Sequence, residues 1–418
     1  MKSILRKVES QKVTVALLGE GIRAGGHFLL SLLDGHPNIA CIPIELQFYR
    51  YWNNLNCSAI LDPEELSEII CEKFRVSRLK KGEFHSLADD RQEWGNFNND
   101  VFQSEVKRRI TKYGANRRHA LLAIHEAFFV ALGKDIDDLK LILLDEDHTA
   151  KDHVSTFLQD YPNGRFIGLI RSPISSLISA KMVTLYKNDW LVHMKQNSIG
   201  ATFAINNNFG ILVDIFNAFV KLERELGKNR FLYLRYEDLL NDRKKTIKTL
   251  TAWLMIPFNS CLMECTILGK VFYPNSVYQK IKIKKDISFD KKYLLYSHCC
   301  ERLVIGLVFY KHMRRFDYEF EEFQGKNALF LNVLGALAWF VPFRYEIGWM
   351  FNRTSRAFSE HIPSRPWVFW IYQAAPWLIK IIRRSFMLFI PILNIFIFLL
   401  QRIYIFISFL KGRYRLNT

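Results

Sequence analysis

Short apolar segments alternate with helical patterns between residues 13 and 253, and this alternation decides the fold class. Segments 13–18, 140–145, 165–170 and 230–236 are runs of aliphatic and aromatic residues of strand length. Each run is followed by a turn and then by a segment with helical character. Strands that alternate with helices pair in parallel, and continuous apolar runs indicate strands covered on both faces. We therefore predict an α/β fold with a central parallel sheet flanked by helices.

Two further helices have recognisable end signals. Asp62 and Pro63 form an N-cap and a first-turn proline, which predicts a helix from Pro63 to about Phe74. A second helix is predicted over residues 117–132, where Gly133 ends it.

The net charge of +17 indicates an anionic partner. Residues 327–418 hold eleven Lys and Arg against two acids, a net charge of +9, and the first 326 residues carry the remaining +8. Half of the 418 residues are hydrophobic, which excludes a disordered chain. In the tail the basic residues are interleaved with bulky apolar ones and no nucleic-acid-binding motif occurs. We therefore expect no nucleic-acid partner.

The chain changes character after residue 326. Segments 327–343, 367–382 and 386–410 are apolar, but 386–400 is short against the roughly 20 residues of a membrane-spanning helix. We expect an α-helical region that lies in the membrane interface and turns basic residues such as Arg402 toward lipid headgroups. A true span and an apolar subdomain packed on the core are the alternatives. The predicted domains are 1–326 and 327–418.

The expected location follows from the N-terminus, the cysteines and the tail. The first residues, MKSILRKVESQK, lack the apolar core of a signal peptide. Seven cysteines without a CxxC pair are typical of a reduced protein without a zinc site. Together with the basic apolar tail, these features predict a protein at the cytoplasmic face of a membrane.

A glycine-rich turn, GEGIRAGGHF, joins the first predicted strand to a helix. Backbone N–H groups in such a turn, together with the helix N-terminus, form a site for an anion. Gly25 and Gly26 allow a phosphate to approach closely, and Arg23 supplies a guanidinium. The turn is not a Walker A loop, because it lacks the Lys-Ser/Thr pair that serves Mg²⁺-nucleotide chemistry.

Three ordered motifs extend this prediction. GIRAGGHFLLSLLDGHPNI resembles the 5′-phosphosulfate loop of sulfotransferases, whose pattern is roughly RSGTTLLxxLLDxHPxI. RFIGLIRSPISSLIS resembles their 3′-phosphate segment, and FLYLRYEDLLNDRKKTIKTLTAWLMIPF resembles the YEDL segment that follows. The resemblance covers about residues 11–310 and is weak between 53 and 140. It implies a P-loop-like sulfotransferase fold and the donor 3′-phosphoadenosine 5′-phosphosulfate (PAPS), with no metal.

The resemblance also implies which residues hold PAPS. The turn would hold the 5′-phosphosulfate, and the second motif would hold the 3′-phosphate. A late basic segment resembles the loop that closes over the nucleotide, with a solvated basic face as the alternative. The implied donor-binding residues are Arg23, Ala24, Gly25, Gly26, His27, Phe28, Arg171, Ser179, Lys284 and Lys285.

The loop and its surroundings depart from the family in ways that bear on catalysis. Gly26 and His27 stand where the family has hydroxyl residues; His27 either donates to the donor substrate or faces solvent. Glu45, after a predicted strand at 39–44, is the expected catalytic base, with a capping or salt-bridged glutamate as the alternative. Arg23 is expected to neutralise the transferred group. His148 stands where relatives often have a lysine, and would assist the leaving phosphate unless it is a solvent-facing loop residue.

Other polar residues in the motifs are expected to be structural. His36 belongs to an HP pair that is typical of a turn. Glu237 and Asp238 are neighbours after a strand and usually point apart, so we do not predict them to be a catalytic pair.

These features favour a PAPS-dependent sulfotransferase that modifies a hydroxyl or amine of a membrane-proximal acceptor, such as a glycolipid or a lipid-linked saccharide. One alternative is a nucleotide-binding or membrane scaffold protein that has lost its chemistry. Another is a different P-loop phosphotransferase. The sequence predicts neither the identity of the acceptor nor the oligomeric state.

Overall fold

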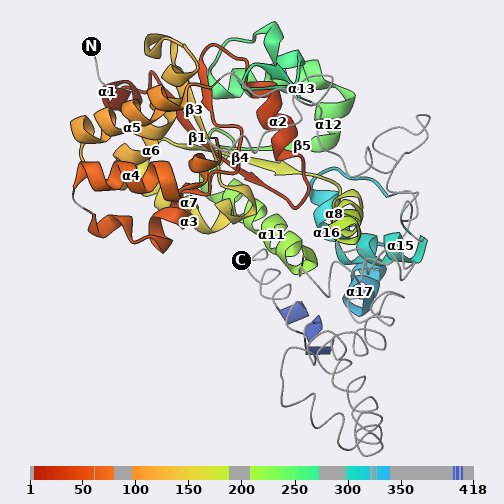
Figure 1. Cartoon of the computed structure of the whole chain (residues 1–418). Helices are drawn as coiled ribbons and strands as arrows, with labels where there is room; N and C mark the ends of the chain where they lie inside the picture. The colour runs from red at the N-terminus through yellow and green to blue at the C-terminus, as the bar shows by residue number, and fades with distance from the viewer. Residues whose placement is uncertain are drawn as a thin grey trace, which may run out of the picture. The chain divides into compact units, whose positions relative to one another are not determined.

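The computed structural model describes most of the chain up to residue 338 and a few residues near the C-terminus (Figure 1). The predictions for Lys284 and Lys285 lie outside the described residues. The residues that the structure describes are 4–60, 62–79, 97–187, 208–272, 297, 299–320, 323, 325, 327–338, 399–400, 402–403 and 406–407.

The chain forms two compact units. The first comprises residues 1–171 and 218–276, and the second comprises residues 172–217 and 277–418. The central sheet and the glycine-rich turn belong to the first unit. The domain boundary expected after residue 326 from the change in composition stays a prediction.

All five strands of the central sheet run parallel, in the order β2-β3-β1-β4-β5. β1 lies in the middle, where Leu18 pairs with Asp145 of β3 on one side and with Ile167 of β4 on the other. Nearly every residue of these three strands is buried, so both faces of the sheet are covered. The predicted parallel α/β sheet is confirmed. The strands are β1 (Thr14–Glu20), β2 (Ile39–Cys41), β3 (Leu141–Asp145), β4 (Arg165–Ile170) and β5 (Phe231–Arg235).

The predicted helices form close to their sequence signals. The Asp62 carboxylate accepts hydrogen bonds from the backbone N–H groups of Glu64 and Glu65 and so caps α4. Gly133, at φ 74°, follows the end of α6. These confirmed helices are α2 (Gly26–Leu33), α4 (Pro63–Lys73), α6 (Arg117–Ala131), α7 (Ala150–Asp160), α8 (Pro173–Lys187) and α13 (Arg243–Leu254).

Further elements of the first unit were not singled out by the sequence patterns. Helix α5 packs against α6, and the buried Arg109 of α5 donates to Glu126 of α6 at 2.8 Å. This pair occupies part of the segment where the family resemblance is weak. The further elements are α1 (Ile4–Glu9), α3 (Phe48–Asn54), α5 (Asn99–Tyr113), α12 (Tyr236–Asn241), β6 (Thr266–Ile267), β7 (Lys270–Val271), and the 3₁₀ turns η1 (Cys57–Ala59), η2 (Arg75–Leu79), η3 (Ile136–Asp138), η4 (Asp147–Thr149) and η5 (Ser260–Met263).

The regular elements that the structure describes in the second unit are helices. Phe216 of α11 packs edge-on against Phe309 and Phe316. Within the described ranges, no helix has both the length and the apolar character needed to cross a membrane. Arg402 is buried, so the prediction that it faces lipid headgroups is wrong. The helices are α8, α11 (Asn208–Leu226, shared with the first unit), α15 (Cys299–Val308), α16 (Tyr310–Arg315) and α17 (Ala328–Ala338).

Buried polar residues anchor the C-terminal end of α2 in the first unit. The Oδ2 atom of Asp34 accepts hydrogen bonds from the Thr266 hydroxyl and from the Gly269 N–H, both at 3.0 Å. His36 Nε2 bonds the carbonyl oxygen of Pro257 at 2.9 Å. Both side chains therefore serve the fold, as expected for His36. They hold the helix that begins at the glycine-rich turn.

We predict that Asp34→Ala lowers the free energy of unfolding by about 2 kcal/mol, because it leaves two donors without their carboxylate. Urea denaturation measures the change. Asp152→Ala is the control, since Asp152 pairs with Lys151 at the surface and should contribute less than about 0.5 kcal/mol. Equal effects of the two substitutions would contradict the anchoring role of Asp34.

Candidate active site

The glycine-rich turn follows β1 at the point where the connections of the sheet diverge. β3 and β4 lie on opposite sides of β1, so the chain crosses from one side of β1 to the other between β3 and β4. In open α/β sheets ligands bind at such a point, outside the carboxyl ends of the strands. The turn runs directly into α2, whose first N–H groups lie at the same edge.

Two residues with positive φ shape the turn. Arg23 has φ 56° and Gly25 has φ 97°. This conformation is easy for glycine and costly for arginine, and such strain is found most often at functional sites. Ala24 and Phe28 are buried, whereas Arg23 and His27 are exposed. The turn therefore presents one guanidinium and one imidazole to a ligand.

Arg171, the first residue after β4, supports the turn. Its Nη1 donates to the carbonyl oxygen of Arg23 at 3.1 Å, and its guanidinium lies 4.7 Å from the ring centre of Tyr236. The Tyr236 ring packs edge-on against Phe28 and fills the space that a Cβ at Gly25 would need. Arg23 and Arg171 are thus brought together at one edge of the sheet. Tyr236, which the sequence did not single out, holds both in place.

A buried carboxylate lies against the start of α2. Glu20, the last residue of β1, accepts a hydrogen bond from the backbone N–H of Gly26 at 2.5 Å. Only 6% of Glu20 is exposed. Burial raises the pKa of this carboxyl well above its usual range, and the nearby charges of Asp145, Asp147 and Glu45 raise it further. Glu20 therefore tends to hold its proton.

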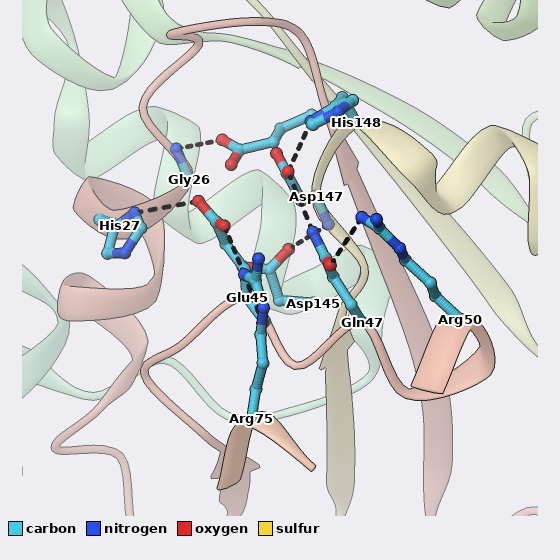
Figure 2. A network of polar contacts seen from close by, with 10 residues as sticks. Gly26, His27, Glu45, Gln47, Arg50, Arg75, Asp145, Asp147 and His148 are labelled. Atoms are coloured by element: carbon cyan, nitrogen blue, oxygen red, sulfur yellow. Dashed lines mark hydrogen bonds and ion pairs between the residues drawn. The ribbon is translucent and has the colours of Figure 1, made fainter. Parts of the chain in front are cut away.

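Glu45, the predicted base, lies beside the turn but in an ion pair. Its Oε2 accepts from Arg75 Nη1 at 2.8 Å, and its Oε1 is 4.0 Å from His27 Nδ1. Figure 2 shows the Glu45 carboxylate between these two side chains. Its side chain is 28% exposed, so a substrate can reach it. The location of Glu45 fits a base, while one of its two carboxylate oxygens is already bonded to Arg75.

His148, predicted to assist the leaving phosphate, pairs with Asp147. Their Nδ1 and Oδ2 atoms are 2.5 Å apart (Figure 2). This hydrogen bond raises the pKa of His148 despite its partial burial. Burial opposes ionisation of Asp147, but the hydrogen bonds from His148 and the charges of His148 and Arg75 together outweigh burial and lower the pKa of Asp147. The pair is therefore an imidazolium-carboxylate pair over a wider pH range than free histidine allows.

Four carboxyl groups meet at this edge. The oxygens of Glu20, Glu45 and Asp147 lie within 4.8 Å of one another, a spacing that can hold a cation. Asp145 accepts from the Asp147 N–H at 2.8 Å, and burial raises the pKa of Asp145. Two of the four groups already bond to a basic side chain: Glu45 to Arg75, and Asp147 to His148. The absence of a metal from the proposed reaction stays a prediction.

The remaining predicted residues lie elsewhere or outside the described ranges. Ser179 is the seventh residue of α8, in the second unit, and is buried. Asp238 pairs with Arg235 at 2.8 Å, which fits the structural role expected for the YED segment. Lys284 and Lys285 are not described.

The carboxyl groups around Glu45 were not predicted, although the sequence contains a signal for them. Glu20 and Asp145 are charged residues at the ends of otherwise apolar strands. Carboxyl ends of neighbouring parallel strands meet at one edge. That rule pairs these two acids once β1 and β3 are known to be neighbours, which the sequence alone does not show.

Comparison with known proteins identifies the family. The sulfotransferase domain of the Synechococcus PCC 7002 olefin synthase is 15% identical with a TM-score of 0.43, and the match covers 74% of this chain and 96% of that one. The sulfotransferase domain from the curacin biosynthetic pathway is 13% identical with a TM-score of 0.40, covering 74% of this chain and 99% of that one. Sulfotransferase STF9 from Mycobacterium avium is 15% identical with a TM-score of 0.36, covering 76% of this chain and 80% of that one. No curated protein matches. The sequence model of the sulfotransferase family matches residues 22–260, more than half of the chain. The chain therefore belongs to the sulfotransferase family.

Proposed function

We propose that the protein transfers a sulfuryl group from PAPS to a hydroxyl or amine of a membrane-proximal acceptor. The observation that carries the proposal is the contact between Arg171 and the turn at Arg23. It joins two separate family motifs at the N-terminus of α2, where an anion is stabilised by backbone N–H groups and the helix dipole.

In this proposal the turn binds the 5′ end of the donor. The N–H groups at the start of α2 and the exposed Arg23 side chain approach the phosphosulfate. Arg171 binds the 3′-phosphate, and the Tyr236 ring keeps its guanidinium in position. Ser179, Lys284 and Lys285 are proposed from the motifs alone to complete the nucleotide site.

The proposed step breaks the S–O bond of the donor and forms a new S–O bond to a hydroxyl acceptor, or an S–N bond to an amine. The acceptor oxygen, or the nitrogen of an amine, attacks sulfur as the bond between sulfur and the 5′-phosphate oxygen breaks, and that oxygen keeps the bonding electron pair. Glu45 takes the proton of the acceptor. Arg23 and the His148 imidazolium stabilise the charge that develops on the sulfuryl group and the leaving phosphate. The hydrogen bond to Asp147 raises the pKa of His148, which favours the cationic form that this role needs.

The proposed acceptor lies at a membrane. Residues 327–418 combine apolar segments with a net charge of +9. On α17, at the start of this region, Leu329 is 74% exposed, Phe330 57% and Val333 53%. Exposed apolar side chains beside a basic sequence suit an anionic bilayer surface. A glycolipid or a lipid-linked saccharide would present its hydroxyl groups at that surface.

One observation favours a second function, a nucleotide-binding protein without chemistry. One carboxylate oxygen of Glu45 is bonded to Arg75, so the predicted base is only partly available to an acceptor. Release of 3′,5′-adenosine bisphosphate (PAP) from labelled PAPS, with transfer of the label, distinguishes an enzyme from such a binding protein.

Arg171→Ala should weaken PAP binding by about 2 kcal/mol, because a charge-assisted pair with phosphate is lost. Isothermal titration calorimetry measures the affinity. Arg165→Ala is the matched control, since Arg165 begins the same strand at its opposite end and stacks on Trp253. Unchanged binding in Arg171→Ala would remove the nucleotide assignment.

Glu45→Gln should lower kcat roughly 10² to 10⁴-fold and leave PAP affinity within about twofold, since it removes a general base and keeps the shape of the side chain. Arg75→Met is the matched control: it breaks the ion pair but keeps the carboxylate, so turnover should persist. Turnover of Glu45→Gln at the wild-type rate would exclude Glu45 as the base.

Replacing Leu329, Phe330 and Val333 together by Ser should reduce binding to anionic vesicles at least about tenfold, because three exposed apolar side chains lose their contact with lipid. Vesicle sedimentation with the full chain measures this. The control replaces Met255 and Phe258, exposed apolar residues of the first unit, by Ser. Equal vesicle binding by wild type and the triple variant would contradict a membrane contact through α17.

A further inference from the structure

The buried carboxyl group of Glu20 occupies a backbone donor of the turn. The N–H of Gly26 is the first of helix α2, and it donates to Glu20 Oε2 at 2.5 Å. The N–H groups of a first helical turn have no partner within the helix and are the ones that an anion binds. Glu20 therefore lies at the spot that the phosphosulfate needs under the proposed function, on which this inference rests.

Glycine at position 26 makes room for this carboxyl group. A Cβ at Gly26 would overlap the carboxyl carbon and both oxygens of Glu20. The family pattern has a hydroxyl residue where Gly26 stands. In this chain the space and the N–H that such a residue would take are used by Glu20 instead.

The charges around Glu20 come from every element packed against it. Glu45 follows β2, and Asp145 ends β3. Asp147 and His148 lie in η4, His27 lies in α2, and Arg75 in η2 reaches Glu45. The two buried or half-buried cations each bond to another acid: Arg75 to Glu45, and His148 to Asp147. Within the described ranges, no basic side chain forms an ion pair with Glu20.

An ionised Glu20 would oppose the donor, and a protonated one would bind it. A carboxylate only accepts hydrogen bonds, so it would face the phosphosulfate oxygens with like charge in a buried site. A neutral carboxyl group has an O–H that can donate to one of those oxygens, as a serine or threonine hydroxyl would. Burial and the acids around Glu20 already favour the neutral form.

We propose that Glu20 binds the donor in its protonated form, donating its O–H to the 5′-phosphosulfate, so that nucleotide binding takes up a proton at any pH where Glu20 is ionised in the free protein. The anion raises the pKa of Glu20 further in the complex. At pH values below the pKa of Glu20 in the free protein, the affinity for the nucleotide does not depend on the ionisation of Glu20. Above that pKa, the affinity for the nucleotide falls by up to tenfold for each unit of pH, until the pH reaches the pKa of Glu20 in the complex.

The test is calorimetry of PAP binding to the full-length protein between pH 7.5 and 10, in paired buffers that contain no phosphate. These buffers differ in ionisation enthalpy, so the difference in heat gives the protons taken up. The phosphates of PAP are already ionised there, since their second pKa is about 6. We expect uptake approaching one proton for wild type, with affinity falling as pH rises. Glu20→Gln should bind PAP without that uptake and with little dependence on pH.

Two matched variants separate Glu20 from other groups. Glu126→Gln removes another buried carboxyl group of raised pKa, one bonded to Arg109 between α5 and α6, and should keep the uptake. His148→Gln removes the histidine of the site and should also keep it. Uptake that is lost in His148→Gln and kept in Glu20→Gln would overturn the proposal.

Three further results would contradict the inference. Binding of PAP by wild type with neither proton uptake nor loss of affinity up to pH 10 would overturn it and leave the proposed function standing. A requirement for added Mg²⁺ that disappears in Glu20→Gln would show that a metal ion, rather than a proton, neutralises the acids. No binding of PAP by wild type at any pH would overturn the proposed function, and this inference with it.

Discussion

The pairing of β1 with both β3 and β4 is the constraint on which the rest of the site depends. It brings the carboxyl ends of three strands to one edge, so that Glu20, Asp145 and Arg171 meet around the first turn of α2. Each of these residues ends or follows a buried apolar strand. The sheet therefore fixes the positions of the polar groups, and the short turn at Arg23 only has to follow them.

Under the proposed function, the charges at this edge both favour and oppose the anionic donor. Backbone N–H groups, Arg23 and Arg171 attract an anion, while four acids lie within the same small volume. Arg75 and His148 compensate two of those acids. The remaining ones are buried, and burial together with their mutual repulsion raises their pKa values. A site of this kind couples the binding of an anion to protonation more readily than a purely basic one.

The fold could be predicted further than the site, because its signals are local. The apolar run of β1 and the Asp62 cap of α4 are readable in a few residues each, and both were confirmed. The placement of Arg23 near Arg171 followed from ordered motifs. The bonds from Glu45 to Arg75 and from Glu20 to Gly26 did not. They depend on which way a side chain points and on which strands are neighbours, and no sequence pattern records either.

Transfer of label from PAPS tests the central claim most directly. The full-length protein is incubated with sulfur-labelled PAPS and a membrane extract, and the extract is fractionated into lipid, saccharide and protein. The account predicts label in an amphipathic lipid or lipid-linked fraction, with release of PAP, and loss of both in the Arg171→Ala variant. PAPS left intact by a folded protein that binds PAP would contradict it, and would assign the chain to nucleotide binding alone.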